Sequence, residues 1–164
     1  GFGFPARLRR LSRFDFGPEQ GITENLPPLT RAPYPALVST VDQDGNELAG
    51  IRLPDVTAPL ATVTGWNLRH PDTGGPDQIH KTMGSTVPFT FTRQERQDTS
   101  DPRPSVEERY ASKEDYLDRM EGVARDLVSE GYMLDEDVLK VGQMAGERYD
   151  LVESQARQAQ PAGD

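Results

Sequence analysis

Cysteine is absent from this sequence of 164 residues. The absence excludes a disulfide framework, a thiolate zinc site and a cysteine nucleophile. No apolar run approaches the ~18 residues that a membrane-spanning helix needs. No glycine-rich loop precedes a predicted helix, and the two histidines and scattered carboxylates have no zinc-ligand spacing. We therefore expect no metal, no cofactor and no transmembrane segment.

Apolar residues are also scarce. Hydrophobic residues make up 34% of the chain, and the mean hydropathy is -0.69. Globular proteins usually contain ~45–50% apolar residues when glycine is included. The sequence has 15 Gly and 14 Pro, concentrated in its first hundred residues. We expect a thin core and a first part that is rich in loops or lies against another surface.

Charge is distributed unevenly. The net charge is -9, with 10 Lys and Arg against 11 Asp and Glu in residues 1–100, and 8 against 16 in residues 101–164. An acidic surface repels phosphate backbones, so nucleic acid is not expected as a partner. Four arginines at positions 7, 9, 10 and 13 could touch a phosphate, but pairing with acidic protein surface is the simpler interpretation.

The first 35 residues predict an extended, proline-rich lead-in. Prolines break any helix there, yet apolar residues recur, including four phenylalanines, which is unusual for a disordered linker. We expect this lead-in to lie across a packed surface that this chain need not contain. The predicted organisation is a lead-in at 1–35, a main region at 36–150 and a flexible tail at 151–164.

Residues 36–53 predict a β-hairpin. Residues 36–41 and 47–53 are β-prone, and the intervening DQDGN supplies a turn in which Gly45 is free to adopt positive φ. The same carboxylates suggest a calcium loop, but the Gly and Glu positions of an EF-hand do not fit. One further strand is expected within 56–64, followed by a long loop over 65–88.

Three to four helices are predicted after residue 92. Thr92 to Glu95 and Ser105 to Glu108 are capping boxes, and Ser112 starts a helix whose apolar stripe begins at Tyr116. Gly131 is the expected end of that helix. A last helix, capped by Asp135, is predicted to fray from about Gln155 and to face inward through Val138, Leu139, Val141, Met144 and Ala145. The predicted fold class is α+β.

Catalytic chemistry is weakly supported by these residues. No Gly-x-Ser-x-Gly turn occurs, and Ser85 lacks both the second glycine and a preceding strand. His70 and His80 lie in turn-like segments without an evident acid partner, so both are interpreted as loop histidines. We assign no catalytic residue.

The most suggestive local string is TGWN, which begins at Thr64. It joins the only tryptophan, Trp66, to the amide of Asn67 directly after an apolar stretch. Thr64, Trp66 and Asn67 could line a substrate pocket, with the indole as a wall and the amide as a hydrogen-bond donor. The alternative is a buried corner in which Asn67 bonds the loop backbone.

Several strings carry a family resemblance. YPALV at 34–38, VDQDGNELAGIRLP at 41–54 and PLATVTGWNLR at 59–69 are followed by shorter matches at 88–89, 92–93, 101–105 and 108–110. Over about residues 10–145 the chain resembles the C-terminal region of the bacterial alpha/beta hydrolase domain-containing proteins. Around residues 70–86 only the Gly-Gly-Pro character is shared.

The resemblance implies a longer parent protein in which the sheet, the nucleophilic serine and the triad histidine precede this region. No triad residue then falls within this chain. It also implies an export signal, and hence a periplasmic or extracellular location. The expected role is a C-terminal portion, non-catalytic by itself, of an esterase-like serine hydrolase that packs on the hydrolase core and helps to form the cleft for a small ester.

Two other interpretations stay open. In one, the apolar lead-in and acidic helices form a protein-interaction module without hydrolase activity. In the other, the chain is a stand-alone enzyme that uses Ser85 with His70 or His80.

Overall fold

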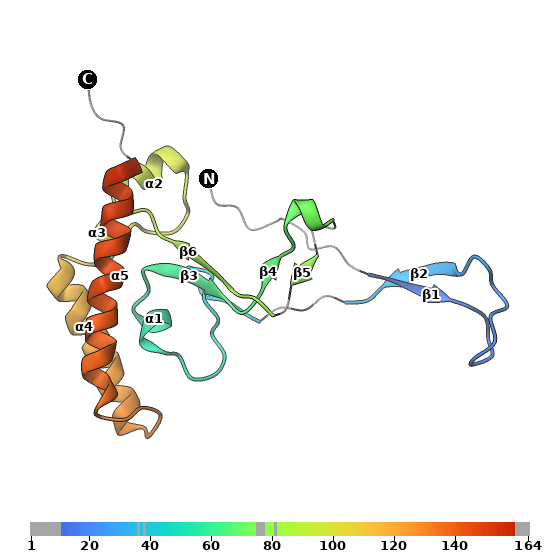
Figure 1. The fold of residues 1–164 in the computed structure, drawn as a ribbon, viewed down its shortest axis with the longest axis horizontal. Coiled ribbons are helices and arrows are strands. Elements are labelled where there is room, and N and C mark those ends of the chain that lie inside the picture. The colour runs from blue at the N-terminus through green and yellow to red at the C-terminus, as the bar shows by residue number, and fades with distance from the viewer. Residues whose placement is uncertain (1–10, 36, 38, 75–77, 81, 160–164) are drawn as a thin grey trace. The chain divides into compact units, whose positions relative to one another are not determined.

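The computed structural model describes residues 11–35, 37, 39–74, 78–80 and 82–159 (Figure 1). These residues form two units. The first, here called the compact unit, contains Ser39–Gly65 and the described residues from Gly84 onward. The second, here called the hairpin unit, contains the described residues of Gly3–Val38 and Trp66–Met83. The chain combines short antiparallel strands with helices, which confirms the predicted α+β class.

The compact unit is built on a two-stranded antiparallel sheet. Strand β3 (Ala61–Thr64) pairs with β6 (Ser85–Pro88), and Thr64 lies opposite Ser85. Proline has no amide hydrogen to donate, which suits Pro88 to the strand end. The strand predicted within 56–64 is confirmed for its second half. Residues 56 and 57 instead end helix α1 (Pro54–Thr57), in which proline occupies the first turn.

Three predicted helix starts are confirmed, whereas the last helix begins at Asp137, two residues after the predicted cap Asp135. Helix α2 (Arg93–Thr99) begins after Thr92, whose Oγ1 accepts from the Glu95 amide at 3.1 Å, and α3 (Val106–Arg109) follows Ser105. Helix α4 (Lys113–Ser129) begins after Ser112, and Gly131 follows its end with φ +81°. With α1 and α5 (Asp137–Ala159), the described residues contain five α-helices, one or two more than predicted.

Helices α4 and α5 pack together (Figure 1), and both contribute residues to the core of the compact unit. The buried residues come from both helices, from α3 and from the loops that flank the sheet: Ala58, Leu60, Phe89, Val106, Tyr110, Tyr116, Met120, Ala145, Tyr149 and Val152. Three tyrosine rings meet within it: Tyr110 and Tyr116 lie edge to face with centroids 5.0 Å apart, and Tyr116 and Tyr149 are tilted with centroids 5.6 Å apart. Burial raises the pKa of Tyr110 to about 12.

The predicted inward face of α5 was partly wrong. Val138 and Ala145 are buried, but Leu139 is 78% exposed and Met144 is 47% exposed. The helical period of 3.6 residues places Tyr149 and Val152, rather than Leu139, on the face of Val138 and Ala145. The helix also continues to Ala159, beyond the predicted onset of fraying near Gln155.

The hairpin predicted over 36–53 was also wrong. Residues 36 and 38 lie outside the described part of the chain, and the rest of the segment forms a single bridge between Val41 and Glu47. Asp42 and Asn46 direct their side chains to backbone groups, which competes with a strand ladder. The turn itself is present, with Gly45 at φ +82°.

The hairpin unit contains two separate strand pairs. Strand β1 (Ser12–Asp15) pairs with β2 (Leu29–Pro33), where an irregular lead-in was predicted. Strand β4 (Asn67–Leu68) pairs with β5 (Ile79–His80), with a 3-10 turn at Pro71–Thr73 between them. The loop predicted over 65–88 is therefore interrupted by β4, β5 and β6.

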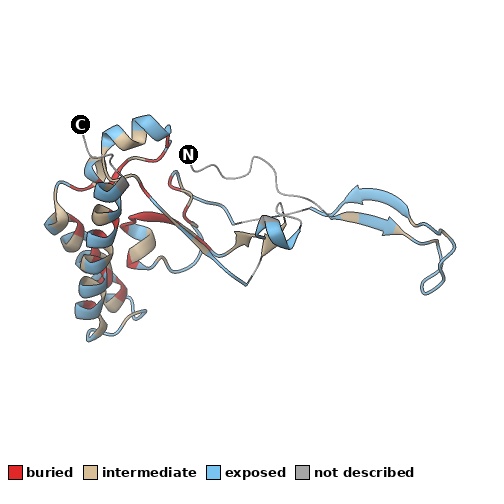
Figure 2. Cartoon of the chain, turned by 45° about the horizontal axis from the view of Figure 1, so that its top comes forward, coloured by how far each residue is buried: buried red, intermediate tan, exposed pale blue. Residues whose placement is uncertain are grey.

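Large apolar side chains of the β1–β2 segment are exposed, and Figure 2 shows β2 in pale blue and β1 partly in pale blue and partly in tan. They are Leu11, Phe14, Phe16, Ile22, Leu26, Leu29 and Tyr34. Among the helices that the structure describes, none combines the length and the hydrophobicity needed to cross a membrane.

Candidate functional site

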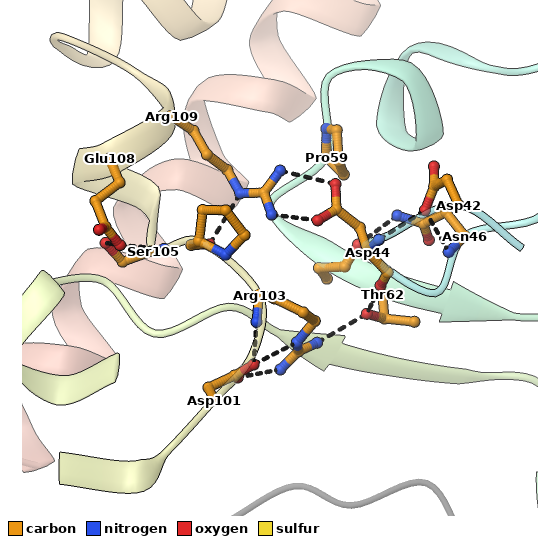
Figure 3. A network of polar contacts seen from close by, with 12 residues as sticks. Asp42, Asp44, Asn46, Pro59, Thr62, Asp101, Arg103, Ser105, Glu108 and Arg109 are labelled. Carbon is orange, nitrogen blue, oxygen red and sulfur yellow. Dashed lines mark hydrogen bonds and ion pairs between the residues drawn. The ribbon is translucent and has the colours of Figure 1, made fainter. Parts of the chain in front are cut away.

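The most extensive polar site of the compact unit begins at the turn of residues 42–46 (Figure 3). The Asp42 carboxylate accepts from the backbone amides of Asp44 and Asn46 at 2.9 and 3.0 Å. Its other oxygen accepts from Arg52 at 2.6 Å. Aspartate commonly bonds its own backbone two residues on in this way, and this explains why the sequence turns here.

Two side chains fasten this turn to strand β3. The carboxamide of Asn46 is fully buried, donates to the carbonyl oxygen of Ala61 at 3.2 Å and accepts from the amide of Val63 at 2.7 Å. The hydroxyl of Thr62, also fully buried, donates to the carbonyl oxygen of Asp44. The Asn46 carboxamide therefore bonds backbone groups of β3 that a neighbouring strand would otherwise bond.

Arg103 joins the sheet to the loop before α3. Its guanidinium forms a bidentate pair with Asp101, with Nε–Oδ1 and Nη2–Oδ2 distances of 2.9 and 2.6 Å. It also donates to Thr62 Oγ1 at 2.8 Å and to the Val87 carbonyl at 3.1 Å. The side chains of Arg103 and Asp101 are only 5% and 7% exposed. The hydrogen bond from Arg103 lowers the pKa of Asp101 below its ordinary value.

Arg109 makes the second buried pair. Its guanidinium forms a bidentate pair with Asp44, and its Nε donates to the Pro104 carbonyl at 2.9 Å. The same guanidinium lies 4.1 Å from the ring centroid of Phe89, and that of Arg103 lies 5.0 Å from it. Planar guanidinium groups suit both bidentate pairing and contact with an aromatic face.

The start of α3 extends the network toward α2. The Glu108 carboxylate accepts from the backbone amide of Ser105 at 3.0 Å and from its hydroxyl at 2.7 Å, and it pairs with Arg96 at 2.8 Å. The amide of Ser105, then its hydroxyl, then Arg96 lower the pKa of Glu108 from 4.5 to about 2.

These contacts form one network of ion pairs and hydrogen bonds that holds parts of the compact unit together. The carboxylates of Asp42, Asp44 and Asp101 are each paired with an arginine, so the buried charges balance. Such pairs are stable only while both partners remain, because either one alone would be a buried, uncompensated charge. The network fixes the 42–46 turn, the sheet and the start of α3 against one another. Its one serine, Ser105, donates its hydroxyl to Glu108 within the capping box of α3.

The predicted pocket residues fall in both units. Thr64 ends β3 in the compact unit, is 5% exposed and lies 2.5 Å from the Ser85 hydroxyl through its Oγ1. Trp66 and Asn67 belong to the hairpin unit and are half-buried. Asn67 Oδ1 accepts from the Leu68 amide at 2.7 Å, as the corner interpretation expects. The pocket remains a prediction.

The histidines make local contacts. His70 Nδ1 accepts from the Asp72 amide at 3.3 Å and lies 3.5 Å from the Asp72 carboxylate, with both side chains highly exposed. His80 Nδ1 lies 3.2 Å from the Thr82 hydroxyl. Ser85 belongs to the compact unit and both histidines to the hairpin unit, so a catalytic set that combines them stays a hypothesis.

Sequence reasoning missed the arginine network. Asp44 and Arg109 are 65 positions apart, and no local pattern couples them. The available signal was an arginine between two prolines, Pro102 and Pro104, directly before a capping box. Prolines hold that segment out of a helix, and the side chain of Arg103 extends to both strands of the sheet.

The fold is mixed α/β, and its buried ion pairs hold neighbouring elements of the compact unit together. A family model described as an alpha/beta hydrolase domain matches residues 10–142. The chain belongs to this family, as the sequence resemblance predicted. Comparison with curated proteins found no match, and comparison with solved structures found none.

Proposed function

We propose that this chain is the C-terminal, non-catalytic part of a serine α/β-hydrolase that acts on a small carboxylic ester. It packs on the hydrolase core and contributes to the wall of the substrate cleft. Membership of the family supports the hydrolase class. The chemistry of that class needs a serine on a sharp Gly-x-Ser-x-Gly turn, and this sequence has no such turn.

The observation that carries the proposal is the exposure of the β1–β2 segment. A two-stranded hairpin is marginally stable in water unless another surface covers one of its faces. Here Phe14 is 58% exposed, Leu26 84% and Leu29 49%. Clustered apolar side chains of this size mark a surface that meets another part of a protein. The hydrolase core is the surface that family membership supplies.

The compact unit supports the proposal in a different way. Its buried ion pairs hold the loops around β3 rigidly, so Thr64 has a fixed position at the strand end. A rigid strand end is a suitable support for a cleft wall. Thr64, Trp66 and Asn67 are the proposed contacts with the substrate.

The coding sequence before Gly1 gives the cheapest test. The proposal requires an in-frame strand followed by Gly-x-Ser-x-Gly. An upstream region without this motif contradicts the proposal and favours the interaction module.

Activity of the 164-residue chain gives the second test. With p-nitrophenyl butyrate as substrate we expect the background rate, unchanged by Ser85→Ala. Hydrolysis that disappears in Ser85→Ala would instead identify a stand-alone enzyme. Addition of the hydrolase core is expected to produce activity, and Phe14→Ser combined with Leu29→Ser is expected to weaken that reconstitution.

A further inference from the structure

An apolar groove lies beside the turn between α4 and α5, within the compact unit. We call it the turn groove. It has a volume of about 430 Å³ and is lined by Gly131, Tyr132, Met133, Leu134, Asp137, Lys140, Val141 and Met144. Tyr132 is 59% exposed and Leu134 is 62% exposed, and neither belongs to the core.

The turn groove is preformed by backbone hydrogen bonds. The amides of Tyr132 and Met133 both donate to the carbonyl oxygen of Leu127, at 2.8 and 3.2 Å, and Gly131 adopts φ +81°. These bonds fix the direction in which the chain leaves α4. A preformed apolar surface loses little conformational entropy when it binds a partner.

Ion pairs on the two helices are distributed unevenly. Away from the turn, the cations of α4 and α5 are paired: Lys113 with Asp150, Arg119 with Asp115, Arg125 with Glu121, Arg148 with Asp55, and Arg157 with Glu153. At the turn, the structure shows no ion pair to any described residue for Glu130, Asp135, Glu136 or Asp137. Among the described residues, Lys140 is the one cation that lines the groove. Glu130, Asp135 and Glu136 are exposed and each adjoins a lining residue in the sequence. Together with Asp137 they are called the acidic rim, and they outnumber Lys140.

Interaction with the helix dipoles explains only some of the acidic residues of this rim. Asp137 opens α5, where the helix dipole favours a negative charge. Glu130 occupies the end of α4, where the dipole disfavours one. A positively charged partner would relieve that unfavourable interaction.

We propose that the turn groove binds a basic amphipathic segment of a partner protein. Its apolar side chains enter between Leu134 and Met144, and its lysines or arginines pair with Glu130 and Glu136. Methionine is flexible and polarisable, and it adapts to apolar partners of different shapes. An amphipathic helix laid in an apolar groove is a common mode of peptide recognition. The inference does not depend on the proposed hydrolase function.

The test uses the full chain and a fluorescein-labelled synthetic helix of leucine and lysine, measured by fluorescence anisotropy. We expect binding that weakens as salt is raised. Met144→Ser and Glu130→Lys should each weaken binding about tenfold at low salt, because one removes apolar contact and the other reverses a rim charge. The two side chains are outside the core, and circular dichroism checks that both variants remain folded.

Matched controls separate the groove from the rest of the acidic surface. Leu139→Ser and Glu147→Lys change exposed residues of α5 that do not line the groove, and both should bind within about twofold of the unchanged chain. A leucine and glutamate helix should not bind. The proposal is overturned if neither peptide binds, if the acidic peptide binds equally well, or if the controls lose as much affinity. It is also overturned if light scattering shows a dimer that Met144→Ser dissociates, because a second copy would then occupy the groove.

Discussion

The two units of this chain use polar and apolar residues in opposite ways. In the compact unit, Asp44 and Arg109 are buried with side chains 8% and 12% exposed, and they bond each other. In the hairpin unit, the ion pair of Asp15 with Arg31 is more open, and large apolar residues such as Leu26 face outward. The compact unit pairs its buried charges internally, whereas the hairpin unit leaves large apolar side chains exposed.

The largest expected effect concerns the buried ion pairs. Arg109→Met leaves Asp44 buried without a partner and should lower the free energy of unfolding by about 3–5 kcal/mol. Arg31→Met removes the exposed pair of the hairpin unit and should lower the free energy of unfolding far less, because solvent screens an exposed ion pair. Urea denaturation followed by circular dichroism measures both. Equal losses would remove the distinction between the units.

A double variant sharpens this prediction. Asp44→Leu combined with Arg109→Met removes both charges, so part of the loss in Arg109→Met should be recovered. A double variant less stable than either single variant would show that Arg109 acts mainly through Phe89 and Pro104.

Apolar truncations should also separate the units. Met120 is 1% exposed in the core, and Met120→Ala should lower the free energy of unfolding by about 2–5 kcal/mol. Leu26→Ala in the hairpin unit should change it by less than about 0.5 kcal/mol. Thermal unfolding measures the difference. A large loss in Leu26→Ala would mean that the described chain itself buries this residue.

Acid should weaken the compact unit through Glu108. Its folded pKa of about 2 lies below the ordinary value of 4.5, so its contribution is complete above pH 4.5 and is lost as the pH falls through about 2. Unfolding free energies measured across this range should fall less steeply in Glu108→Gln. The pKa of Asp15 is also lowered, chiefly by Arg31, but Asp15→Asn should leave the acid response of the compact unit unchanged. An unaltered slope in Glu108→Gln would contradict the role of the Ser105 contact.

The smallest effect is a gain. Gly142 lies within α5, and a Cβ placed there meets nothing within 4 Å. Gly142→Ala should therefore raise the free energy of unfolding by about 0.5–1 kcal/mol, because alanine has the higher helix propensity. Urea denaturation measures the gain, and a loss of stability would show a close contact at this face.

The sequence predicted those features that depend on neighbouring residues. Thr92, Ser105 and Ser112 cap helices through contacts three residues away, and the stripe that begins at Tyr116 follows a single period. Local β-propensity failed at residues 36–53, because the side chains of Asp42 and Asn46 bond backbone groups that a ladder would use.

The site was less predictable than the helices. Thr62 and Arg103 are 41 positions apart, and their contact depends on how the sheet packs against the loop before α3. For Thr64 the sequence left a substrate pocket and a buried corner open, and the side chain is buried and contacts the Ser85 hydroxyl. A single sequence contains no signal for pairings at this separation.

Hydrogen–deuterium exchange tests the central claim most directly. In the isolated chain, amides of the network such as Val63 should exchange slowly, whereas those of the β1–β2 segment should exchange rapidly. In the full-length hydrolase, or with the hydrolase core added, residues 11–35 should become protected while the compact unit changes little. If the β1–β2 segment is already as protected as β3 in the isolated chain, or stays unprotected with the core present, this chain is not a docking part of a hydrolase.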